Sequence, residues 1–90
     1  MRFGIIGAGP IGSIISKKLV KNGHDVKIAD ARGIERLEGK EFAGTPVLVE
    51  DVIKNIEVLI ISLPIKAMPS ILDIINQVGE EVIIVDTSNY

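Results

Sequence analysis

The sequence predicts an α/β fold in which a doubly wound parallel sheet, with strand order 3-2-1-4-5, carries helices on both faces. Short runs rich in Ile, Val and Leu alternate along the chain with segments of helical spacing, as expected for parallel strands joined by helices. Aromatic residues make up only 3% of the chain, so aliphatic side chains must build the core. Right-handed crossovers then place the ligand crevice at the carboxyl ends of the first and fourth strands.

The first part of the chain predicts two strands around a helix. Residues 2–6 are the first apolar run, and residues 25–30 are the second. Helical spacing between them puts four apolar residues on one face, namely Ile11, Ile14, Ile15 and Leu19. Asn22-Gly23 ends this helix, since glycine is favoured just past a helix C-terminus. A charged stretch over residues 32–41 has helical character around its centre.

The second part predicts three more strands. In order, the elements are a strand over residues 46–49, a helix over 50–55, a strand over 57–63, a helix over 67–78 and a strand over 82–86. Pro69 falls in the first turn of the longer helix, where proline is tolerated. The apolar face of that helix is expected to carry Met68, Ile71, Leu72 and Ile75.

Composition excludes several classes of function. Ninety residues suit one domain, covering residues 1–90. A net charge of −2 gives no reason to expect nucleic acid or an anionic membrane as partner. The chain has no cysteine and one histidine, so disulfides, thiolate sites and a metal cluster are not expected. No stretch approaches the roughly 20 apolar residues that span a bilayer, and we expect a soluble cytoplasmic protein.

Glycines recur at a spacing typical of a phosphate-binding turn. Gly7-Ala8-Gly9-Pro10-Ile11-Gly12 follows a strand, opens a helix and precedes a strand that ends on Asp30, which is the context that makes this pattern specific. Gly7 permits the tight turn, Gly9 lets a pyrophosphate approach the backbone, and Gly12 allows the helix to pack closely on the strand. A plain turn would need only one glycine. The sequence therefore favours a dinucleotide-binding unit of the Rossmann type.

The end of the second strand carries two conflicting signals about the cofactor. Asp30 is placed to accept both ribose hydroxyls, which favours NAD(H) and repels a 2′-phosphate. Arg32, and Arg36 one helical turn further on, could instead clamp a 2′-phosphate. The two arginines could equally form a solvated charged face that pairs with nearby glutamates. These residues alone leave the choice between NAD and NADP open.

Polar residues also follow the fourth and fifth strands. Ser62-Leu63-Pro64 is expected to face the glycine turn across the crevice and to contact the cofactor ribose, although the proline could simply end the strand. Thr87 and Asn89 come after the last strand, where the nicotinamide of a bound cofactor should lie. They could hydrogen-bond its carboxamide or a substrate, or they could belong to an ordinary polar loop.

Taken together, these segments resemble the NADP oxidoreductase, coenzyme F420-dependent family. The resemblance covers the whole chain and rests on residues 3–12, Gly23-His24-Asp25-Val26, residues 29–33, Ser62-Leu63-Pro64 and residues 85–89. It implies a reductase that transfers a hydride between NADP(H) and a deazaflavin (coenzyme F420), a flavin-like molecule, or a small carbonyl or imine acceptor. No catalytic side chain is expected, because the cofactor carries the chemistry.

The resemblance also bears on the choice of cofactor. A Ser-Arg pair and a basic residue one turn on hold the 2′-phosphate in that family, and Arg32 and Arg36 match the basic positions. Ala31 replaces the serine, and Asp30 stands where a small or neutral residue is more usual. NADP(H) is thus favoured, with NAD(H) as the alternative. The resemblance further implies that residues 1–90 are the cofactor domain of a longer enzyme, which could form a homodimer.

Two other classes share the glycine turn. A nucleotide-sensing regulatory module of the potassium-transport type would also have Gly-His-Asp-Val and an aspartate after the second strand, but it lacks Leu63-Pro64 and Asp86-Thr87-Ser88-Asn89. An FAD-binding protein would have glutamate after the second strand and a long insertion before the next crevice strand. Neither feature is present here.

Overall fold

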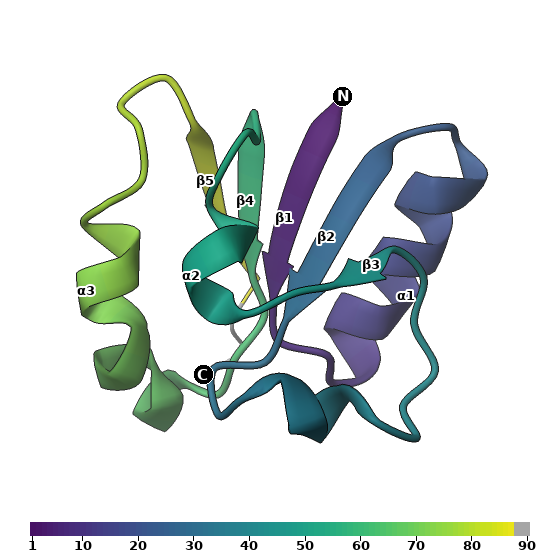
Figure 1. The fold of residues 1–90 in the computed structure, drawn as a ribbon, viewed down its shortest axis with the longest axis horizontal. Helices are drawn as coiled ribbons and strands as arrows, with labels where there is room; N and C mark the ends of the chain where they lie inside the picture. Colours follow the sequence, from purple (N-terminus) through teal and green to yellow (C-terminus); the bar gives the residue numbers. More distant parts are fainter. Residues whose placement is uncertain (88–90) are drawn as a thin grey trace.

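The structure, a computed structural model, describes residues 1–87 and contains a five-stranded sheet of order β3-β2-β1-β4-β5 (Figure 1). Every pair of neighbouring strands is parallel, which confirms the predicted fold class and strand order. The strands are β1 (Arg2–Ile6), β2 (Asp25–Ala29), β3 (Thr45–Pro46), β4 (Val58–Ile61) and β5 (Ile83–Asp86). The helices are α1 (Pro10–Lys21), α2 (Val49–Val52) and α3 (Leu72–Ile75), with 3-10 helices η1 (Ile34–Leu37) and η2 (Ile65–Ile71).

Helices cover both faces of the sheet and bury one apolar cluster on each. On one face, Ile15 and Leu19 of α1 pack against a cluster that includes Ile5, Val26 and Ile60. On the other face, α2, η2 and α3 pack against a cluster built around Ile6, Leu59 and Ile61. Successive residues of β1 and β4 thus point to opposite clusters, as expected for strands buried on both sides.

The register of the sheet brings four strand ends to one edge. Ile6 is the last residue of β1 and pairs with Ala29 of β2 and Ile61 of β4. Ile61 pairs in turn with Asp86 of β5. The next residue in each case, Gly7, Asp30, Ser62 or Thr87, therefore leaves the sheet at the same level. This edge lies at the bottom of Figure 1.

Two predicted elements differ from the observed ones. The strand predicted over residues 46–49 is only Thr45–Pro46, and Val49 instead begins α2. The single helix predicted over residues 67–78 is a 3-10 helix, η2, followed by the one-turn α3. Because the helical segment begins at residue 65, Pro69 lies inside it and has no N–H to donate to the carbonyl of residue 66, its partner in a 3-10 helix.

Some residues on the predicted apolar helix faces are exposed. Ile11 and Ile14 of α1 are 46% and 55% exposed, and Leu72 is 50% exposed. Helical spacing shows which side chains share one face of a helix. A side chain on that face is buried only where another part of the chain packs against it. Among residues 1–87, no helix is both long enough and apolar enough to cross a membrane.

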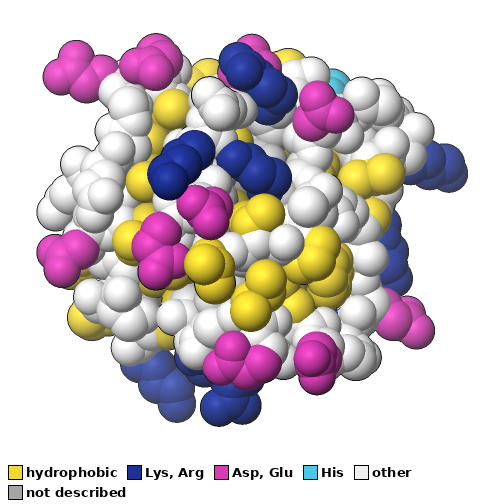
Figure 2. Space-filling model, in the orientation of Figure 1, with side chains coloured by type: hydrophobic (Ala, Val, Ile, Leu, Met, Phe, Trp, Pro, Cys, Tyr) yellow, Lys and Arg dark blue, Asp and Glu magenta, His cyan; other side chains and the backbone are white. Residues whose placement is uncertain are grey.

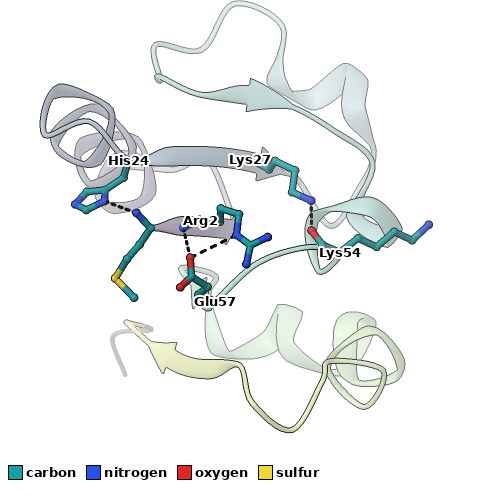
Figure 3. A network of polar contacts seen from close by, with 6 residues as sticks. Arg2, His24, Lys27, Lys54 and Glu57 are labelled. Atoms are coloured by element: carbon teal, nitrogen blue, oxygen red, sulfur yellow. Dashed lines mark hydrogen bonds and ion pairs between the residues drawn. The ribbon is translucent and has the colours of Figure 1, made fainter.

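Polar contacts fasten the opposite edge of the sheet, where the strands begin (Figure 3). The Lys27 ammonium donates to the main-chain carbonyls of Asp51 and Lys54, which lie at the end of α2 and just beyond it. Glu57 accepts hydrogen bonds from the backbone N–H and the side chain of Arg2. Cations near the last carbonyls of a helix are favourable, so these contacts help to hold α2 and the start of β4 against β1 and β2.

The glycine turn lies very close to β4 and to its own helix. A Cβ at Gly7 would be 2.1 Å from the carbonyl oxygen of Ser62, and the φ of Gly7 is +112°, a conformation that side chains disfavour. A Cβ at Gly12 would be 2.1 Å from the carbonyl oxygen of Gly7. By contrast, a Cβ at Gly9 would meet no atom of residues 1–87 within 4 Å. Gly7 and Gly12 are thus required by packing, and Gly9 is not.

We expect Gly12→Ala to lower the free energy of unfolding by about 3 kcal/mol, because the new methyl group would push α1 away from the backbone of the turn. Gly9→Ala is the matched control and should stay within about 1 kcal/mol of the unmodified chain. Urea unfolding followed by circular dichroism measures both. Equal destabilisation of the two variants would contradict this division of roles.

Candidate functional site

The N-terminus of α1 points into the edge where the strands end. Gly9 is the N-cap residue and Pro10 the first helical residue, and no side chain among residues 1–87 caps this helix. The first N–H groups of a helix have no intrahelical partner and carry the positive end of the helix dipole. The open space beside Gly9 lets an anion reach them without meeting a Cβ.

A hollow of about 360 Å³ lies on the β2 side of this turn. We call it the β2-side hollow. Three groups of residues line it: the glycine turn, the end of β2 with the loop before β3, and the segment after β4. They are Gly7, Ala8, Gly9, Asp30, Ala31, Arg32, Lys40, Ser62, Leu63, Pro64, Lys66, Ala67 and Ser70.

A second hollow, of about 330 Å³, lies on the β5 side of the same turn. This β5-side hollow is lined by Gly9, Pro10, Ile11, Ser62, Leu63, Pro64 and Thr87. Thr87 is fixed there because its backbone N–H and its hydroxyl both donate to the carbonyl oxygen of Ile61, at 2.8 and 3.0 Å. Gly9 and Ser62-Leu63-Pro64 line both hollows, so the two form one crevice that crosses the glycine turn.

Asp30 and Arg32 form a tight ion pair in the wall of the β2-side hollow. Oδ1 of Asp30 accepts hydrogen bonds from the backbone N–H of Arg32 at 2.8 Å and from its Nε at 3.1 Å. Oδ2 accepts from Nη2 at 3.1 Å. The Asp30 side chain is only 4% exposed, whereas that of Arg32 is 61% exposed. Both carboxylate oxygens are therefore engaged within the protein.

This pairing shifts the titration of both groups. Burial alone would raise the pKa of Asp30, but hydrogen bonds from Arg32 and the positive charges of Arg32 and Lys40 outweigh it, so the pKa lies below its ordinary value. The same hydrogen bonds and the charge of Asp30 raise the pKa of Arg32. The pair is ionised at neutral pH.

Two lysines reach the β2-side hollow that the sequence reasoning missed. Lys40 follows η1, in a loop held against α1 by a 3.0 Å hydrogen bond from the backbone N–H of Ala43 to the buried Ser16 hydroxyl. Lys66 lies in η2, on the wall formed after β4. Figure 2 shows Lys and Arg side chains at the lower edge of the molecule, where the strands end in Figure 1.

Most of the predicted cofactor contacts come together around this crevice. Among the described residues, Gly12 lies behind the turn and Arg36 is exposed in η1 without lining the β2-side hollow. Asn89 lies outside the described residues. Ser62-Leu63-Pro64 was expected at this edge because it follows the fourth strand. Extending that expectation two residues further along the chain would have included Lys66.

A parallel sheet of order 3-2-1-4-5 with a glycine turn between its first strand and helix defines a Rossmann-type, dinucleotide-binding domain. The chain belongs to the NADP oxidoreductase, coenzyme F420-dependent family, whose model matches residues 2–90. It is thus an NAD(P)-binding domain of an oxidoreductase family. No curated protein sequence matches it.

Solved structures with the same fold include three longer chains. One, assigned as a 2-dehydropantoate 2-reductase from Enterococcus faecalis, has a TM-score of 0.73 at 21% identity, over 99% of this chain and 34% of its own. An imine reductase from a Pseudomonas species has a TM-score of 0.69 at 22% identity, over 98% of this chain and 32% of its own. A hypothetical protein from Sinorhizobium meliloti has a TM-score of 0.69 at 28% identity, over 99% of this chain and 44% of its own. The chain thus spans less than half the length of each.

The lowered pKa of Asp30 makes stability depend on pH with a definite sign. The ion pair stabilises the fold above the ordinary carboxyl pKa of about 4, and this contribution is lost as pH falls through the lowered pKa of the folded state. We expect Asp30→Asn to cost about 2 kcal/mol at neutral pH and progressively less in acid.

Chemical unfolding at a series of pH values measures this difference. Glu80→Gln, which changes an exposed carboxylate before β5, is the control and should leave stability nearly unchanged throughout. A cost for Asp30→Asn that is the same in acid as at neutral pH would contradict the ionised pair.

Proposed function

We propose that this chain binds NADP(H) and presents its nicotinamide to a second substrate for hydride transfer. The observation that supports this most directly is the crevice that crosses the glycine turn, with open space at Gly9 and a hollow on each side. A dinucleotide has two nucleoside halves joined by a pyrophosphate. The arrangement of two hollows around one anion-binding helix N-terminus matches that shape.

In this proposal each part of the cofactor has its own residues. Main-chain N–H groups at the start of α1 bind the pyrophosphate, and the β2-side hollow takes the adenosine half. Arg32 and Lys40 bind the 2′-phosphate as cations on the same wall. Lys66 adds positive charge on the opposite wall. The hollow is lined by three cations, Arg32, Lys40 and Lys66, and by one anion, Asp30. The net positive charge of these side chains is close in size to the negative charge of a phosphate monoester.

The β5-side hollow would hold the nicotinamide. The Thr87 hydroxyl already donates to Ile61, so its oxygen remains able to accept a hydrogen bond from the carboxamide. Asn89 is proposed as a second partner. Leu63, Pro64 and Ile11 line the same hollow and exclude water from one face of the ring.

The bound cofactor supplies the hydride, and the residues of this chain bind and orient it. The acceptor or donor is proposed to be a deazaflavin, a flavin-like molecule, or a small carbonyl or imine compound. The rest of the second substrate's site is proposed to come from outside residues 1–90, as part of a longer reductase.

Titration of the purified chain with NADPH and NADH, followed by calorimetry, tests the proposal. We expect NADPH to bind more tightly, and Gly9→Ala to weaken both dinucleotides by about tenfold or more, because its methyl group would displace the pyrophosphate from the helix N-terminus. Absence of binding to either dinucleotide at millimolar concentration, in a folded sample, would refute the proposal.

Lys40 and Arg36 provide a matched pair of cation removals. Lys40→Ala should weaken NADPH by about tenfold through loss of a charge-assisted contact, and it should leave NADH unchanged. Arg36→Ala should change neither, because Arg36 does not line the β2-side hollow. The reverse result, with Arg36 and not Lys40 affecting NADPH, would assign the 2′-phosphate contact to η1.

A further inference from the structure

An acidic residue at the end of the second strand of this fold ordinarily accepts the ribose hydroxyls of NAD and disfavours the 2′-phosphate of NADP. Asp30 stands at that position, directly after β2, yet it lies in the wall of a hollow that also carries Arg32 and Lys40. A bare carboxylate there and a 2′-phosphate would repel each other. Binding of NADP(H) in this hollow therefore requires that the negative charge of Asp30 be offset.

Hydrogen bonds from Arg32 offset the charge of Asp30. Within the described part of the chain, its two oxygens accept three hydrogen bonds, all from Arg32. The Arg32 guanidinium pairs with both carboxylate oxygens, and the Asp30 side chain is 4% exposed whereas the Arg32 side chain is 61% exposed. Asp30 and Arg32 both line the β2-side hollow, so a ribose there would compete with Arg32 for the carboxylate oxygens.

We propose that Arg32 masks Asp30, so that a single side chain converts a site with the acidic residue of an NAD(H) site into one for NADP(H). This inference rests on the proposed function. The guanidinium has five N–H donors, of which Nε–H and one N–H of Nη2 are directed at Asp30. Three donors remain for a phosphate, and the carboxylate holds the group in place so that it need not be ordered on binding.

Masking has a consequence that simple loss of a phosphate contact does not have. Removing the guanidinium uncovers the carboxylate, which still accepts from the backbone N–H of residue 32. The uncovered acid can then accept from ribose hydroxyls, and it repels a 2′-phosphate. Burial raises the pKa of Asp30, whereas the backbone hydrogen bond from residue 32 and the charge of Lys40, both kept in the variant, lower it. Affinity for NADH should therefore rise while affinity for NADPH falls.

The test compares Arg32→Ala, Arg32→Gln and the double variant Asp30→Asn/Arg32→Ala with the unmodified chain by calorimetric titration. We expect Arg32→Ala to bind NADPH at least about tenfold more weakly and NADH about fivefold more tightly. The double variant should lose the gain in NADH affinity, because its residue 30 carries no charge. Arg36→Ala, the matched arginine outside the hollow, should behave as the unmodified chain.

Thermal unfolding of each variant controls for the carboxylate that Arg32→Ala leaves without its ion-pair partner, and Arg32→Gln keeps a neutral donor near it if the alanine variant does not fold. Preference for NADPH in the unmodified chain, with no gain in NADH affinity in either folded Arg32 variant, would overturn the masking and leave the proposed function intact. A gain that persists in the double variant would overturn it as well. Binding of neither dinucleotide by the unmodified chain would overturn both.

Discussion

The site depends on a close backbone approach that no side chain would allow. The carbonyl of Ser62 at the end of β4 lies against Gly7, and the carbonyl of Gly7 lies against Gly12 in α1, each within 2.1 Å of where a Cβ would stand. Strand end, turn and helix are thereby stacked with nothing between them. This stacking puts the start of α1 beside the ends of β1 and β4, and the two hollows open on either side of it.

Local signals in the sequence were sufficient for the architecture. The glycine turn, the Asn22-Gly23 helix end and the aliphatic runs predict the element order, and the handedness of crossovers then predicts the strand order. The expectations that differ from the structure concern features that depend on contacts with residues distant in the sequence. Ile11 and Ile14 share a face with the packed Ile15, yet nothing in the described chain covers them fully. A proline is tolerated in the first turn of a helix but not further inside it, so the outcome at Pro69 depends on where the helix begins. The boundaries of an element are its least predictable feature.

The candidate site was predictable where a residue directly follows a strand. Gly7, Asp30, Ser62 and Thr87 all follow paired strand ends, so the topology alone brings them together. Lys40 could not be found this way, because its position depends on how the loop after η1 returns along α1. The contact between Asp30 and Arg32 did leave a trace in the sequence. An aspartate commonly accepts from the backbone N–H two residues on, and that turn is what brings the arginine side chain over the acid.

The exposed strand β5 has a consequence for how the crevice behaves over time. Its apolar residues Ile83, Ile84 and Val85 are 60%, 45% and 40% exposed, and among the described strands it pairs with β4 alone. An edge strand with so little burial opens locally at a lower free-energy cost than the central strands. Thr87, held by Ile61 of β4, closes the β5-side hollow just beyond it. Amide hydrogen exchange in residues 83–87 thus reports on the integrity of that hollow, and a ligand bound across it would slow the exchange by linking the edge of the sheet to its centre.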